Sequence, residues 1–187
     1  MAALLASFPI SVDQYHAMIA KGILGPDDKV ELIHGRLEAK MSKHPPHSLC
    51  NRKIDLALSR AAPNSWHVRN QDAVTLGDSE PEPDILIVRG KLEDYGHRHP
   101  GASEVGLVVE VADSSLARDR SVKRWMYAQA GIPVYWIANL VDMRIEAYSE
   151  PSGGDYTVRC DYVTGEFVPL ILDKAGAGPI AVDSLLP

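Results

Sequence analysis

Two short apolar runs in this chain each carry a carboxylate, and this pair constrains the fold more than any other feature. Asp84 directly precedes the run 85–88, and Glu110 directly follows the run 106–109. A carboxylate inside an apolar, strand-like segment is costly unless it is paired, protonated or bound to a cation. If the two runs are neighbouring strands, both carboxylates meet at one edge of the sheet. The sequence therefore predicts a polar site built on two adjacent strands.

The composition is that of one globular domain. The chain has 187 residues, of which 45% are hydrophobic and 24% charged, so we expect a single domain over residues 1–187 with one substantial core. No apolar run approaches the ~20 residues of a membrane-spanning helix, and we expect no membrane partner. Cys50 and Cys160 lie far apart without a zinc-ligand spacing. This usage predicts free thiols and a cytoplasmic location.

The net charge limits the kind of nucleic-acid contact that the chain can make. The formal charge is −6 and the pI is near 5.6, which argues against a protein that coats nucleic acid through bulk positive charge. A nuclease remains compatible with this charge, because a metal site adds acidic residues and phosphate contacts can be local.

Hydrophobic periodicity predicts alternating helices and strands. Ser11 is a candidate N-cap for a helix over 11–19, and His34-Gly35 a tight turn between strands 29–33 and 36–41. Further helices are expected over 47–62 and 117–130, an exposed loop over 90–101, and strands over 66–69, 73–76, 83–88, 106–111, 134–137, 143–148, 156–160 and 167–172. This order predicts an α/β (α+β) fold, with a mixed β-sheet core flanked by helices and antiparallel C-terminal strands.

The helix expected over 117–130 has two distinct faces. Its apolar positions form one stripe of the kind that faces a core: Val122, Trp125, Met126 and Ala130. Gly131 stands at the position of a C-terminal helix cap. Asp119, Lys123 and Tyr127 follow one another at four-residue spacing, on roughly the side away from that stripe.

Asp84 and Glu110 are the first candidates for chemistry. Two hard oxygen ligands with open water positions suit Mg²⁺ or Mn²⁺, and such an ion polarises a phosphoryl oxygen and activates a bound water. Lys123 is a candidate to stabilise charge on a scissile phosphate. The alternative is that Asp84 caps a strand, that Glu110 ends a strand at the surface, and that Lys123 forms an ordinary helix pair with Asp119.

These residues, taken in order, resemble a known family. The likeness rests on Asp84 after a proline, 107–111, 113–115, Asp119, Lys123, 127–131 and 135–137, with Glu31, Gly35, Met41 and His47 ahead of them and 180–185 behind. Together they resemble the Uma-type family, restriction-endonuclease-like bacterial proteins of the PD-(D/E)XK nuclease superfamily. The resemblance covers most of the chain. It implies a restriction-endonuclease-like fold and a metal-dependent endonuclease that hydrolyses phosphodiester bonds in DNA.

The resemblance also implies roles for individual residues. Asp84 and Glu110 correspond to the two metal carboxylates, and Glu31 to an acidic position that often completes the shell of Mg²⁺ or Mn²⁺. The superfamily lysine usually stands two residues after the second carboxylate. That position is Ala112 here, so Lys123 on the following helix is the candidate replacement. A homodimer is expected by analogy, because cutting two strands needs two centres; the strands within 143–172 are candidates for its interface or for covering the core.

Several alternatives stay open at this point. The departure at Ala112 and the negative net charge favour a non-catalytic nucleic-acid-binding or regulatory module on the same fold. His47 either faces the metal site, together with Asp119 and Tyr127 as further cleft residues, or lies at the surface. The pair His44 and His47 is a weak signal for structural zinc.

Overall fold

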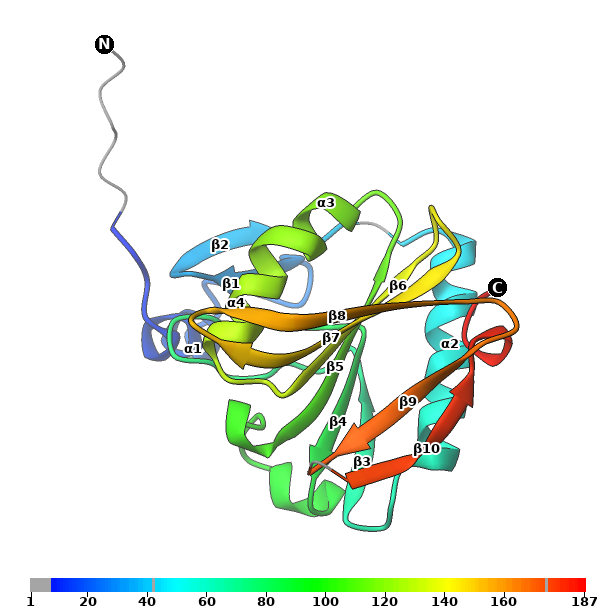
Figure 1. Ribbon diagram of the computed structural model, residues 1–187. Helices are drawn as coiled ribbons and strands as arrows, with labels where there is room; N and C mark the ends of the chain where they lie inside the picture. The colour runs from blue at the N-terminus through cyan, green and yellow to red at the C-terminus, as the bar shows by residue number, and fades with distance from the viewer. Residues whose placement is uncertain (1–7, 42, 174) are drawn as a thin grey trace.

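The computed structural model describes residues 8–41, 43–173 and 175–187. Within these residues the core is a six-stranded sheet in the order β3-β4-β5-β6-β7-β8 (Figure 1). Its strands are β3 (Trp66–Asn70), β4 (Ile85–Arg89), β5 (Val105–Ala112), β6 (Val134–Asn139), β7 (Arg144–Ser152) and β8 (Asp155–Val163). In this sheet β5 and β6 run parallel, and the other neighbours are antiparallel. The expected mixed sheet is confirmed.

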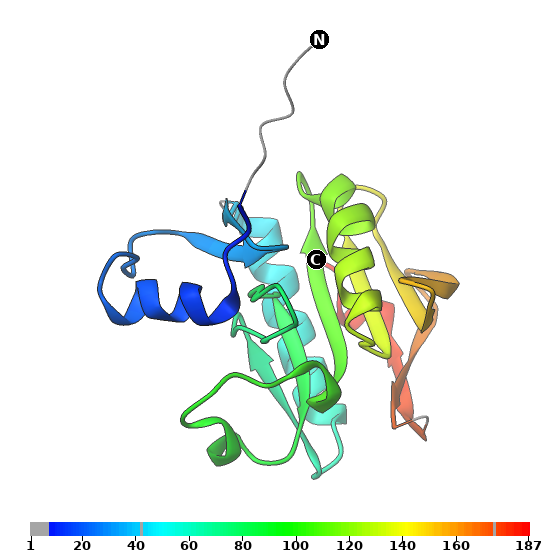
Figure 2. The same cartoon turned by 90° about the vertical axis from the view of Figure 1, so that its left-hand side faces the viewer.

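Helices and a separate hairpin cover the two faces of this sheet. One face packs against α2 (Pro45–Ala61), the hairpin β9 (Phe167–Leu172) and β10 (Ala175–Ala181), and the 3-10 turn η4 (Val182–Ser184). The other face lies under a helical segment made of α3 (Leu116–Arg118), the π-turn η3 (Asp119–Lys123) and α4 (Arg124–Gln129). Figure 2 shows α2 and this segment on opposite sides of the central strands. Strand β4 is buried on both faces, which explains its continuous apolar run.

The N-terminal part of the chain lies beside the second face. It consists of α1 (Val12–Ala20), β1 (Val30–Ile33) and β2 (Arg36–Ala39). The connection between β4 and β5 contains two 3-10 turns, η1 (Leu92–Tyr95) and η2 (Ala102–Glu104). Ser11 caps α1 as expected, through reciprocal bonds with Gln14. His34 and Gly35 form the expected turn of the hairpin, both with positive φ (47° and 70°). A β-bridge from Leu32 to Glu80 ties this hairpin to the rest of the domain.

Two predictions about helices and strands are wrong. Residues 73–76 form no strand: Thr75 bridges to Gly101, while Val74 and Leu76 donate to carbonyls of their own loop, at Pro81 and Ser79. Helix α2 begins at Pro45, two residues earlier than expected, because proline is well suited to the first turn of a helix. The antiparallel C-terminal strands are confirmed, but they lie in two sheets, because β9 pairs with β10 in a hairpin of its own. No described helix is both long and apolar enough to cross a membrane.

The predicted apolar stripe of the 117–130 helix is also wrong in part. Val122 and Trp125 are 38% and 43% exposed, whereas Lys123 and Tyr127 are buried together with Met126. The helix turns this side inward because it covers buried polar groups of the sheet, which need hydrogen-bonding partners from the helix. The loop 90–101 is mostly exposed as expected, including its two histidines, but Tyr95 within it is buried.

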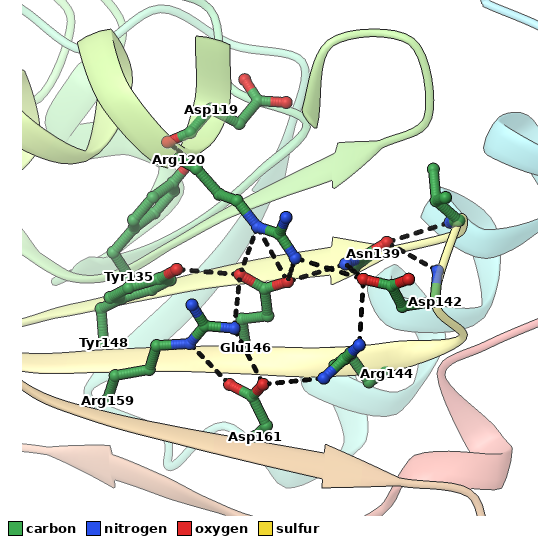
Figure 3. Close-up of polar contacts among 11 residues, drawn as sticks. Asp119, Arg120, Tyr135, Asn139, Asp142, Arg144, Glu146, Tyr148, Arg159 and Asp161 are labelled. Atoms are coloured by element: carbon green, nitrogen blue, oxygen red, sulfur yellow. Dashed lines mark hydrogen bonds and ion pairs between the residues drawn. The ribbon is translucent and has the colours of Figure 1, made fainter. Parts of the chain in front are cut away.

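A polar network is buried where β6 and β7 meet the π-turn (Figure 3). Glu146 on β7 has no exposed surface; it accepts bonds from Arg120 Nε at 3.1 and 3.0 Å, from Asn139 at 2.7 Å and from the Tyr148 hydroxyl at 2.8 Å. Burial acts to raise the pKa of Glu146, but the bonds from Arg120, Asn139 and Tyr148 hold that pKa at about 2. Further ion pairs extend the network toward the surface, through Asp142, Arg144, Arg159 and Asp161.

Close packing of β5 against its neighbours depends on Gly106. A Cβ atom at this position would lie 2.7 Å from Leu172 of β9 and within 2.8–2.9 Å of the Trp66 ring of β3. Since real Cβ contacts are longer than this, the glycine is what lets the β9–β10 hairpin reach the sheet.

The pairing of Glu146 predicts a defined acid sensitivity. Its pKa is lowered in the folded protein from about 4.3 in an unfolded chain to about 2, so the stability that it contributes is present above about pH 5 and is lost as the pH falls toward 2. We expect the difference in unfolding free energy between wild type and Glu146→Gln to be largest at neutral pH and to shrink between pH 5 and pH 3, measured by urea unfolding. A difference that stays constant over this range would contradict the assignment.

Gly106→Ala is expected to destabilise the protein by about 1–3 kcal/mol, because the added methyl group forces Trp66 or Leu172 out of place. Thermal and urea unfolding measure this loss. Gly77→Ala is the matched control, since nothing lies within 4 Å of a Cβ at that position. Equal stability of the two variants would contradict the packing argument.

Candidate active site

Asp84 and Glu110 lie side by side on neighbouring strands. Ile85 of β4 pairs with Val109 of the antiparallel strand β5. Asp84 precedes Ile85 and Glu110 follows Val109, so these two residues occupy adjacent positions at the same end of the two strands. Both residues are buried, with 5% and 4% exposure, and Asp84 accepts the backbone N–H of Val111 at 2.9 Å. The two carboxylates thus meet at one sheet position, as the sequence predicts, and Glu110 is not a surface residue.

Two side chains contact Asp84, one from just before α2 and one from the first turn of α2. Lys43 Nζ lies 3.0 Å from one carboxylate oxygen, and His47 Nε2 lies 3.1 Å from the other. Burial acts to raise the pKa of Asp84, but His47 and Lys43 outweigh it and hold the pKa below its usual value. Asp84 is therefore an anion within a ring of donors, and His47 faces the site rather than the solvent.

Glu110 receives its partners from the helical segment above the sheet. Lys123 Nζ donates to Glu110 Oε1 at 2.8 Å, and the Tyr127 hydroxyl donates to the same oxygen at 2.8 Å. Burial raises the pKa of Glu110 to about 8, with the ammonium of Lys123 opposing the shift and the charges of Asp119 and Asp84 adding to it. Burial also favours the neutral amine of Lys123, but Glu110, Glu31 and Asp119 raise its pKa above the usual value.

Two more carboxylates complete the acidic side of the site. Glu31 on β1 is 3% exposed; it accepts the backbone N–H of Glu82 at 3.2 Å and a guanidinium N–H of Arg118 at 3.1 Å. Asp119, at the start of the π-turn, accepts the Ser115 hydroxyl at 2.6 Å, and burial raises its pKa. Lys123 thus bonds to Glu110 and not, as in the alternative considered from the sequence, to Asp119.

These groups line a cleft of about 550 Å³ between the β1–β2 hairpin, the start of α2 and the π-turn, a volume that suits a small ligand or a segment of a larger one. The wall is mixed in charge. Its basic residues are Lys29, Lys40, Lys43, Arg118 and Lys123, its acidic residues are Glu31, Glu82, Asp84, Glu110, Asp113 and Asp119, and His44 and His47 also line it. The cleft is therefore far less negative than the six carboxylates alone would make it.

The structure brings the sequence candidates together. Asp84, Glu110, Glu31, Lys123, His47 and Asp119 all line the cleft, and Tyr127 lies fully buried beneath Glu110. Sequence reasoning missed Lys43 and Arg118, because each stands in a segment without a motif and reaches its carboxylate only through the fold. Ala112 is fully buried at the end of β5, and the ammonium beside Glu110 comes from Lys123 instead.

The donor set fits a hard divalent cation better than zinc. Among the described residues, no three His, Cys, Asp or Glu side chains converge as a ready metal cage, which gives the His44–His47 zinc hypothesis no support. Mg²⁺ does not need such a cage, because it keeps several waters and is held by one or two carboxylates together with substrate phosphates. Asp84 and Glu110 are two such carboxylates on neighbouring strands at the cleft.

The comparisons with known proteins agree with this architecture. Residues 12–171 match the Uma2 family, described as "putative restriction endonuclease". No curated protein matches the sequence. The crystal structure of a putative nuclease belonging to DUF820 from Anabaena variabilis ATCC 29413 has the same fold, with a TM-score of 0.70, 14% identity, and coverage of 95% of this chain and 97% of that chain. Because the family match spans most of the sequence, the chain belongs to the Uma2 family of putative restriction endonucleases.

Proposed function

We propose that this protein is an endonuclease that hydrolyses phosphodiester bonds in DNA with Mg²⁺ or Mn²⁺ as cofactor. One observation carries the proposal: two buried carboxylates, Asp84 and Glu110, meet on neighbouring strands at the base of a cleft, with the Lys123 ammonium 2.8 Å from Glu110. Membership of the Uma2 family and the shared fold with a putative nuclease support a nuclease-like function.

The residues around the two carboxylates have separate roles in this proposal. Asp84 and Glu110 would hold the metal ion, with Glu31 as a third acidic residue on the facing hairpin. When bound, the ion would polarise the scissile phosphate and lower the pKa of a water molecule. Lys123 stands beside the metal carboxylate, where an ammonium stabilises the negative charge that develops on the phosphoryl oxygens. Tyr127 fixes the orientation of Glu110 by its hydrogen bond.

The basic residues at the cleft are suited to bind phosphates next to the scissile one. Lys29, Lys40 and Arg118 line the cleft and keep part of their surface accessible, and Lys43 is 38% exposed at its side chain. These contacts are local, which reconciles a phosphate-binding cleft with a net charge of −6. Binding through a few such contacts is weak and falls with rising salt.

A second candidate is a nucleic-acid-binding module on the same fold that does not cleave. It is favoured by the observation that both carboxylates already have partners within the protein, Lys43 and His47 at Asp84 and Lys123 at Glu110. The position of Lys123 argues against this second candidate, because Lys123 supplies an ammonium group beside Glu110 that Ala112 does not.

A cleavage assay separates the two candidates. With supercoiled DNA, linear DNA and RNA as substrates and Mg²⁺ or Mn²⁺ present, we expect wild type to cleave DNA and EDTA to stop the reaction. Asp84→Asn and Glu110→Gln should abolish cleavage, and Lys123→Met should lower kcat by about 10²–10³-fold through loss of charge stabilisation. Lys91→Met, at an exposed residue that does not line the cleft, is the matched control.

Cleavage that survives both carboxylate substitutions would point to a contaminant or another site. Binding of DNA by wild type without cleavage in either metal would favour the binding module.

The buried pair of Lys123 and Glu110 also predicts a change in stability. Lys123→Met leaves Glu110 without its charged donor and should cost about 1–3 kcal/mol at pH 7. The pKa of Glu110 is already raised to about 8 and should rise further in this variant. A carboxyl group whose pKa is raised by folding makes the protein less stable as the pH rises toward that pKa. This loss ends near pH 8 in wild type but continues to higher pH in the variant, so the difference in unfolding free energy between the two should widen above pH 8. Urea unfolding at pH 7 and pH 9 measures it.

The double variant Lys123→Met/Glu110→Gln is the control, because a neutral side chain at position 110 needs no counter-charge. It should recover part of the stability and lose the widening at high pH. An equal pH dependence in the single and double variants would contradict the charge argument.

A further inference from the structure

Two buried carboxylates occupy one row across the sheet. Glu110 of β5 pairs with Ile137 of β6, and Ile137 pairs with Glu146 of β7. Residues paired in this way present their side chains on the same face, so Glu110 and Glu146 lie under the same helical segment, about 10 Å apart at two strand spacings. Glu110 belongs to the cleft described above, whereas Glu146 does not line it.

One turn of helix connects the two carboxylates. Lys123, the last residue of the π-turn, donates to Glu110 at 2.8 Å. Arg120, three residues earlier, donates through Nε to both oxygens of Glu146 at 3.1 and 3.0 Å. The π-turn therefore contributes one basic side chain to each of the two carboxylates in the row, Lys123 to Glu110 and Arg120 to Glu146; Figure 3 shows the Arg120–Glu146 contact.

The backbone of the π-turn is held at its first residue. The carbonyl of Asp119 accepts the N–H of Arg124, five residues on, and also the hydroxyl of Tyr135 at 3.2 Å (Figure 3). π-turns are rare and less favourable than α-helix, so they persist where neighbouring groups support them. In this turn the support comes from Tyr135 below and from the Arg120–Glu146 pair at the side.

The contacts of Glu146 hold Arg120 in one place. The Tyr148 hydroxyl, Asn139 and Arg120 occupy both of its oxygens, and Arg159 of β8 adds an ion pair at 3.4 Å. A carboxylate with all these donors, and with no exposed surface, has a fixed orientation. The bidentate guanidinium contact then fixes the helix relative to β7.

We propose that Arg120 and Glu146 are positioning residues, whose ion pair fixes the π-turn so that Lys123 is held against Glu110 in the cleft. The proposal rests on the proposed function only for its catalytic consequence; the placement of Lys123 is a structural claim that can be tested without activity.

The test measures how well Lys123 is protected. Wild type, Arg120→Met, Glu146→Gln and the double variant are treated with a water-soluble acetylating ester well below the unfolding temperature, and acetylation of each lysine is followed by mass spectrometry. In wild type, Lys123 is 8% exposed and ion-paired and should react slowly. We expect both single variants to raise its acetylation rate at least about tenfold through local opening of the turn. The double variant should show no further increase, because both substitutions break one contact.

The chain offers internal controls. Cys50 is free and fully buried in the core, and Cys160 is free and exposed, so thiol labelling of Cys50 reports global opening. Arg159→Met is the matched variant, since it removes another guanidinium from Glu146 but from β8, which leaves the helix contact intact. It should leave Lys123 protected. Arg120→Lys keeps one charge and should give an intermediate rate, which provides a milder variant if Arg120→Met does not fold.

Three results would overturn the proposal: unchanged Lys123 protection in folded Arg120 and Glu146 variants, a parallel rise in Cys50 labelling, or an equal effect of Arg159→Met. If wild type cleaves DNA, the variants that expose Lys123 should lower kcat with little change in KM, and Arg159→Met should not. If wild type does not cleave, the proposed function fails, while the acetylation rates still decide whether Arg120 and Glu146 position Lys123.

Discussion

The antiparallel pairing of β4 with β5 is the constraint on which the rest of this site depends. It places Asp84 and Glu110 together, both buried, at one end of the two strands, and two carboxylates in such a place repel each other and lose their hydration. Side chains from other parts of the chain pair with the two carboxylates: Lys43 and His47 contact Asp84, and Lys123 contacts Glu110. The start of α2 and the π-turn are thereby brought to the same end of these strands, and both contribute to the lining of the cleft.

The helical segment over the sheet shows how the need to pair buried carboxylates shapes local structure. A helix that covered only apolar side chains would bury its apolar stripe. This segment instead turns Lys123 and Tyr127 toward Glu110 and leaves Val122 and Trp125 partly exposed. It also contains a π-turn, anchored by Tyr135 and by the Arg120–Glu146 pair. Hydrogen bonds to buried carboxylates thus outweigh the burial of two apolar side chains, because an unpaired buried charge costs more than a partly exposed aromatic ring.

The comparison with the putative nuclease from Anabaena variabilis shows what the fold requires. At 14% identity the two chains superpose over nearly their whole length, with a TM-score of 0.70, so most side chains can change while the sheet and its flanking helices remain. In this chain the cation beside Glu110 comes from the helix rather than from position 112 of β5. A charge needed at one place can be supplied from another element, provided that the element is held firmly over the sheet.

The sequence by itself determined most of the strands, the hairpin turn at His34-Gly35, the approximate helices and the pair of carboxylates, because periodicity and turn chemistry are local properties. The resemblance to the Uma family also pointed to Lys123 and Glu31. Only the tertiary structure decided that Lys43 and Arg118 complete the cleft, that residues 73–76 form no strand, and that Glu146 lies in one row with Glu110. Periodicity tells which residues share a face, but the orientation of that face depends on what it covers. In this protein the helix face covers buried charged groups, and the partners of those groups are the side chains nearest in space, which can be far away along the chain.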